Sequence, residues 1–109
     1  MSEGRLGSVG STIAATLVQP YFVPSTAVSA TVKIHMCNTA TGPAKVRIAF
    51  SLSATTPSLG EYQYYDSIIP ANGGTLTDDC RLLSTGEYIH ILSDIAGVTY
   101  RVEGIEQPV

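Results

Sequence analysis

Residues 29–52, SATVKIHMCNTATGPAKVRIAFSL, contain two runs in which apolar and polar side chains alternate on either side of a turn. A period of two is that of a strand with one buried face, and the Gly-Pro pair within NTATGP predicts the turn. The stretch therefore predicts two β-strands. The residues expected to face the core are Val32, Ile34 and Met36 in the first run and Val46, Ile48, Phe50 and Leu52 in the second.

Similar short runs surround this stretch and predict that the whole chain is built from strands. They cover residues 12–18, 61–69, 75–83, 87–93 and 98–106, are rich in β-branched and aromatic residues, and end at Gly, Pro, Asn or Asp. Seven strands at nearly even spacing indicate an all-β fold, a seven-stranded antiparallel two-sheet β-sandwich of immunoglobulin-like type. A jelly roll is the alternative if residues 21–23 add a strand.

The Ser/Gly-rich residues 1–11 predict a flexible N-terminal arm, which leaves residues 12–109 as the sandwich domain. Within residues 75–83 the paired aspartates Asp78 and Asp79 suggest a bulge or a bend. On regular phasing Cys37 faces outward, whereas Cys80 faces the core together with Leu76 and Leu82. We therefore expect two free thiols, because a disulfide needs Cβ atoms about 3.8 Å apart.

Composition excludes several classes of protein for a chain of 109 residues. With 44% hydrophobic residues the chain is not intrinsically disordered. A net charge of −3 from only six basic residues argues against nucleic-acid binding. No apolar run approaches the length of a membrane span, and the first twelve residues lack the apolar region of a signal peptide.

Candidate catalytic and ligand-binding groups are few, and their spacing matches no known arrangement. The histidines are expected on exposed strand faces, the aspartates in turns or bulges, and the glycines at positions 4, 7 and 10 lack the Lys-Ser/Thr of a phosphate loop. We predict no enzyme activity, no catalytic or metal site and no cofactor. The residues weighed for such roles were His35, His90, Glu61, Asp66, Asp78, Asp79 and Asp94.

The low charge content is the main functional clue in the composition. Only 14% of residues are charged, against about 25% in an ordinary soluble domain. Because interfaces are depleted in Lys, Glu and Asp, and charges protect strand edges, we expect the surface to be covered by partners in an assembly. Among the tyrosines, Tyr62 and Tyr64 are expected to face the core, whereas Tyr65 faces outward as a candidate contact residue.

Several short motifs resemble those of small bacteriophage virion proteins of the decoration, neck-collar and tail-fibre-associated type. They are Cys37-Asn38 at a strand end, VRIA at residues 46–49, PANG at 70–73 and the ending at residues 98–104. The resemblance implies a structural protein of the virion, assembled in the host cytoplasm as a homo-oligomer on the capsid or neck, with no nucleic-acid or membrane partner. The alternative is a tail-fibre or baseplate module that binds host glycan through Tyr65 or Tyr88.

Overall fold

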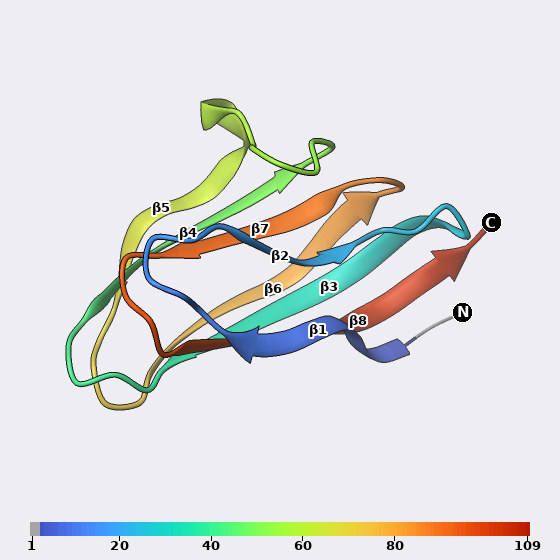
Figure 1. Cartoon of the computed structure of the whole chain (residues 1–109). Helices are drawn as coiled ribbons and strands as arrows, with labels where there is room; N and C mark the ends of the chain where they lie inside the picture. Colours follow the sequence, from blue (N-terminus) through green and yellow to red (C-terminus); the bar gives the residue numbers. More distant parts are fainter. Residues whose placement is uncertain (1–2) are drawn as a thin grey trace.

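Eight strands and one 3-10 turn make up the described part of the chain (Figure 1). The computed structural model describes residues 3–109, without the side chains of residues 3, 8 and 9. The elements are β1 (Glu3–Ser11), β2 (Val18–Phe22), β3 (Ala27–Asn38), β4 (Ala44–Ser51), η1 (Leu59–Glu61), β5 (Tyr62–Ile69), β6 (Gly74–Ser84), β7 (Tyr88–Ser93) and β8 (Val98–Pro108).

The strands form two four-stranded antiparallel sheets packed as a sandwich, which confirms the predicted fold class. Sheet A has the order β1-β8-β3-β6 and sheet B the order β2-β7-β4-β5. Only β4 and β5 are both consecutive in sequence and paired, so the chain crosses between sheets at almost every connection. This order is that of a jelly roll with eight strands, the alternative topology, and it replaces the seven-stranded immunoglobulin-like arrangement.

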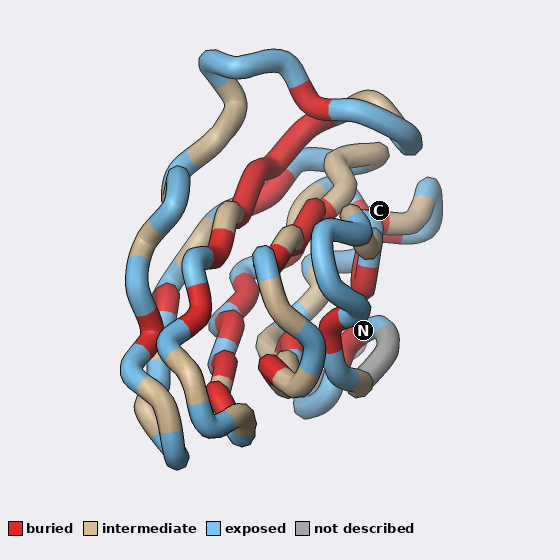
Figure 2. Tube along the Cα trace, turned by 60° about the vertical axis from the view of Figure 1, so that its left-hand side comes forward, coloured by how far each residue is buried: buried red, intermediate tan, exposed pale blue. Residues whose placement is uncertain are grey.

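The core lies between the sheets and is built by the alternating runs, as Figure 2 shows from the buried segments along the strands. Val32, Ile34 and Met36 of β3 pack against Val46 and Ile48 of β4, and all are fully or almost fully buried. Burying each such side chain contributes about 1.5–3 kcal/mol. Leu52, predicted to face the core, is instead exposed because β4 ends at Ser51.

The prediction of a flexible arm before residue 12 is wrong for the described residues, because β1 pairs with β8 at the edge of sheet A. Residues 1 and 2 lie outside the described part. The spaced glycines reflect close packing: a Cβ on Gly7 would lie 2.2 Å from the Pro20 carbonyl oxygen of β2, and one on Gly10 2.9 Å from the Tyr100 hydroxyl. The strand expected over 12–18 is mostly a connection.

β6 contains the bulge that was predicted at the paired aspartates. This bulge overturns the burial pattern that regular alternation predicted for the residues after it. Lys33 of β3 stands opposite two residues, Asp79 and Cys80, and Cys80 takes a positive φ of 56°. The extra residue reverses the inward and outward positions beyond it. Cys80 and Leu82, predicted to face the core, are therefore exposed, whereas Leu83 is buried; both cysteines are free thiols.

Candidate functional site

The two histidines lie on different sheets and do not form a pair. His35 lies exposed on sheet A, where its Nδ1 is 3.0 Å from the Thr77 hydroxyl. His90 of β7 is fully buried, so the prediction that it is a surface residue is wrong. The reason is that the connection over residues 52–61 lies over His90, with the Ser53 carbonyl oxygen 2.8 Å from its Nε2.

Two hydrogen-bond partners from other segments hold the His90 ring in place. Its Nε2 lies 2.8 Å from the Ser53 carbonyl oxygen, which can only accept a hydrogen bond, so Nε2 carries the proton. Its Nδ1 lies 3.2 Å from the Gln19 amide nitrogen, which can only donate. The imidazole therefore ties the connection over residues 52–61 to β2.

The carboxylates weighed for catalysis are engaged in separate local pairs. Asp66 receives Nε and Nη2 of Arg47 at 2.7 and 3.2 Å, and this bond lowers the pKa of the Asp66 carboxyl. Glu61 accepts from the Ser58 backbone N–H at 2.8 Å, which lowers the pKa of Glu61. They therefore do not form a carboxylate pair.

The remaining aspartates are also held by neighbours. Asp79 lies 3.8 Å from the Lys33 ammonium, and Asp94 accepts from the Lys45 backbone N–H at 2.8 Å. Within residues 3–109, no three His, Cys, Asp or Glu side chains that the structure describes are grouped so as to hold a metal ion.

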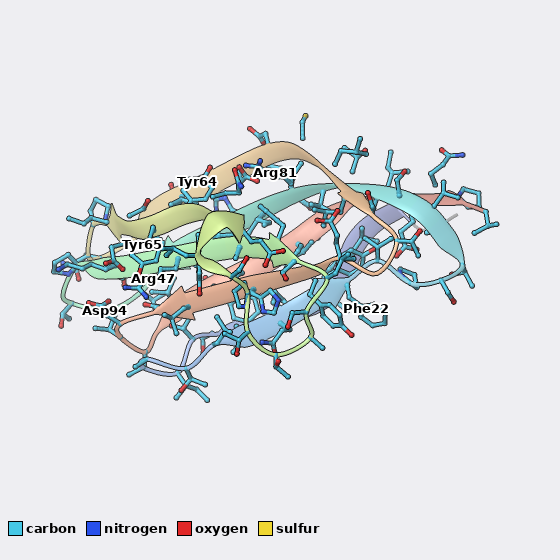
Figure 3. The ribbon with its side chains drawn as sticks, turned by 90° about the horizontal axis from the view of Figure 1, so that it is seen from above. Phe22, Arg47, Tyr64, Tyr65, Arg81 and Asp94 are labelled. Carbon is cyan, nitrogen blue, oxygen red and sulfur yellow. The ribbon has the colours of Figure 1, made fainter. Side chains whose placement is uncertain are left out.

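Two bulges in β5 place its tyrosines on different faces from those that regular alternation predicts. Tyr62 and Tyr65 meet edge to face with ring centroids 5.3 Å apart, and the Arg47 guanidinium lies 3.9 Å over the Tyr65 ring (Figure 3). Tyr64 instead reaches β6 and donates to Asp78 at 2.8 Å. The prediction that Tyr62 and Tyr64 share a face is therefore wrong, whereas Tyr65 is exposed as expected.

A second aromatic group lies on β2 and β7, well away from Tyr65 in Figure 3. Phe22 and Tyr88 stack with centroids 5.1 Å apart and planes inclined by 23°, and 48% of Phe22 is exposed. Phe22 also lines a hollow of about 550 Å³, which we call the β2 hollow; its lining is Gly7, Gln19, Pro20, Tyr21, Phe22, Pro24 and Glu106.

Sequence reasoning missed the polar residues of the β2 hollow. Glu106 lies on β8 of sheet A and accepts the hydroxyl proton of Tyr21 from β2 of sheet B. Burial, reinforced by this hydrogen bond, raises the pKa of Tyr21 well above its usual value. The only signal in the sequence was the Tyr-Phe pair at positions 21 and 22 between two prolines, because the partner carboxylate is 85 residues away.

The outer face of sheet A exposes two large apolar side chains on either side of Thr31. Leu82 of β6 and Ile105 of β8 are both paired with Thr31 of β3, and they are 68% and 48% exposed. Exposed Cys80 and Ile105 share a second hollow of about 280 Å³ on this face. We call Cys80, Leu82, Thr31 and Ile105 the sheet A patch.

All four edge strands carry a register shift. The low content of charged residues did not predict these shifts. The shifts lie between Leu6 and Gly10 of β1, Val18 and Tyr21 of β2, opposite Arg47 in β5 and opposite Lys33 in β6. A bulge twists an edge away from further pairing. The register shifts therefore protect edges that the low charge content alone would leave open.

Comparison of the chain with models of known families, with curated proteins and with solved structures found no match. Within the described residues, no helix is long and apolar enough to span a membrane.

Proposed function

We propose that this chain is a non-enzymatic structural protein of a tailed bacteriophage particle, carried in several copies on the capsid or neck. The observation that carries the proposal is the sheet A patch. The outer face of a sheet in a solitary domain is normally polar. Here Leu82 and Ile105 are exposed on the two strands that flank Thr31. Covering them against another subunit removes apolar surface from water.

The register shifts in the edge strands indicate which kind of contact such copies would make. Because each edge strand has a register shift, a contact through face packing is favoured over the extension of a sheet from one copy to the next. A contact of standard size covers roughly 800 Å² per partner. The charged side chains beside the sheet A patch lie in ion pairs, Lys33 with Asp79 and Arg101 with Glu103, so covering this face would not bury isolated charges.

The jelly-roll order adds support by analogy. Eight-stranded jelly rolls recur in viral capsid and lectin domains, although a fold alone does not define a function. Together with the motifs at residues 37–38, 46–49, 70–73 and 98–104, it favours a particle protein over a free-standing one. The address on capsid or neck rests on the resemblance of those motifs.

Self-association and location in the particle test the proposal together. We expect sedimentation velocity to show a mass that rises with concentration, and mass spectrometry of purified particles of the encoding phage to detect the chain. Leu82→Lys should weaken association by tenfold or more, because it places a charge within the contact. Thr75→Lys, an exposed position of the same strand outside the sheet A patch, is the matched control. A chain that is monomeric at every concentration and absent from particles contradicts the proposal.

A further inference from the structure

The β2 hollow combines an apolar platform with polar walls. Phe22 is half exposed and is held by its stacking on Tyr88, so its ring presents a fixed flat surface. The volume of about 550 Å³ falls within the range of about 300–1,000 Å³ typical of small-molecule sites. Such sites have mostly apolar linings with a few placed polar groups, and this description fits the β2 hollow.

The polar walls present hydrogen-bond acceptors whose orientation is fixed from behind. The Gln19 amide nitrogen lies 3.2 Å from Nδ1 of His90, so the Gln19 amide oxygen is not used in that contact. Glu106 uses its Oε2 to accept from Tyr21, and among the described residues its Oε1 receives no hydrogen bond. The β2 hollow therefore offers a carboxylate oxygen and an amide oxygen beside an aromatic face.

The chemistry of this lining selects among ligand classes. Among the residues that the structure describes, no Arg, Lys or His lines the β2 hollow, which disfavours phosphate, sulfate and carboxylate ligands. A large apolar ligand is also disfavoured, because the walls would leave buried acceptors unpaired. A pyranose ring matches both parts: its C–H face packs on an aromatic ring while its hydroxyls donate to carboxylate and amide oxygens.

We propose that the β2 hollow binds a neutral saccharide, with Phe22 as the stacking platform and Gln19 and Glu106 as hydroxyl acceptors. This site goes beyond the proposed structural role and does not depend on it. It also differs from the glycan hypothesis drawn from the sequence, which placed the contact at Tyr65 or Tyr88. Tyr88 here supports Phe22 from behind, and Tyr65 lies elsewhere on sheet B.

Titration of the labelled protein by nuclear magnetic resonance tests the proposal. The probes are glucose, galactose, mannose and N-acetylglucosamine, with tetramethylammonium and sulfate for the competing ligand classes. We expect at least one saccharide to shift the backbone resonances of Gln19, Phe22 and Glu106 with millimolar affinity. Phe22→Ala should weaken binding about fivefold to tenfold through loss of the aromatic contact. Glu106→Gln should weaken it about tenfold, because charge-assisted hydrogen bonds are the stronger ones.

Matched variants keep the test decisive. Tyr65→Ala removes an aromatic ring of similar exposure, 51% against 48%, from the same sheet, and Glu103→Gln neutralises another carboxylate of β8. Both should bind the saccharide as the unaltered chain does. The proposal is overturned if no saccharide binds, if only tetramethylammonium or sulfate binds, or if Tyr65→Ala lowers affinity while Phe22→Ala does not. Intact amide spectra of each variant confirm that the fold is retained.

Discussion

At each lateral side of the sandwich, a tyrosine of sheet B donates a hydrogen bond to a carboxylate of sheet A, but the surroundings of the two carboxylates differ. On the β5–β6 side Tyr64 donates to Asp78, and on the β1–β2 side Tyr21 donates to Glu106. Asp78 is only 5% exposed and also receives Nε and Nη2 of Arg81 at 3.1 and 2.9 Å. Glu106 has no such cation within the described residues, and its side opens into the β2 hollow.

The difference separates a structural polar cluster from a candidate binding site. At the β5–β6 side the Tyr64 hydroxyl and both Asp78 oxygens have partners, and Arg81 also lies 4.9 Å over the Phe50 ring, so the cluster closes the core. At the β1–β2 side one carboxylate oxygen and one half-exposed ring remain available. A tyrosine bonded to a carboxylate thus identifies a function only when the rest of the carboxylate's environment is known.

The largest expected effect is from removing the charge at the closed side. Asp78→Asn removes the negative charge that faces Arg81 and replaces one of the two acceptor oxygens with an NH2 donor. Breaking a buried ion pair costs about 3–5 kcal/mol. Because a third of the Arg81 side chain is exposed, we expect about 3 kcal/mol, the lower end of that range. Urea unfolding measures it.

Glu106→Gln is the counterpart on the open side. It should cost about 1 kcal/mol or less, since it alters one partly exposed hydrogen bond. Equal losses for Asp78→Asn and Glu106→Gln would remove the distinction between the two sides.

The next largest effect concerns the packing that shapes the open side. In Gly7→Ala the added Cβ would lie 2.2 Å from the Pro20 carbonyl oxygen at a φ of +66°, so β1 must move away from β2. Such overpacking costs about 2 kcal/mol. Gly4→Ala also has a positive φ but meets nothing within 4 Å, so it should cost about 1 kcal/mol from backbone strain alone. Thermal unfolding separates the two, and a loss of stability no larger in Gly7→Ala would mean that the close approach is not strict.

The fold class and most of the core were predictable from the sequence, because alternation alone separates buried from exposed positions in a regular strand. Residues 29–52 showed this at Val32, Ile34 and Met36, which are buried as predicted. Phasing failed where a strand gains a residue: the bulge at Cys80 exposes Leu82, and the register shift at Gln63 places Tyr62 and Tyr64 on opposite faces. Sequence can suggest a bulge but does not fix which residue is extra.

The candidate site was less predictable, because its parts come from distant segments. Gln19 and Phe22 meet Glu106 only once β2 and β8 lie at the same side of the sandwich. The burial of His90 likewise depends on where residues 52–61 fold, since its own strand places it on an outward face. The glycines of β1 resembled a flexible segment because a short sequence does not reveal that the Pro20 backbone lies against Gly7 and the Tyr100 side chain against Gly10.

A smaller effect should distinguish the two tyrosines at high pH. Burial and a carboxylate raise the pKa of both Tyr21 and Tyr64, but the Arg81 charge opposes the rise at Tyr64. A folded-state pKa above the ordinary value of about 10 gives stability that is complete below pH 10 and is lost as the pH rises toward the folded pKa. Tyr21→Phe should therefore flatten the alkaline loss of stability more than Tyr64→Phe, as urea unfolding between pH 9 and 11 would show. A larger effect from Tyr64→Phe would mean that the pKa of Tyr64, and not that of Tyr21, is raised more by its surroundings.

The smallest expected effect comes from a comparison of two Arg–Asp ion pairs that differ in the burial of the carboxylate. Arg47 and Asp66 on the outer face of sheet B use the same nitrogens and both carboxylate oxygens as Arg81 and Asp78 do. Solvent screens the outer pair, and exposed pairs of this kind contribute little to stability. Asp66→Asn also suits the positive φ of 57°, which Asn tolerates well. We therefore expect no measurable change in the urea midpoint for Asp66→Asn, against the large loss for Asp78→Asn. A comparable loss at both positions would show that the Arg–Asp geometry, and not the closure of the sandwich side, determines the contribution of Asp78.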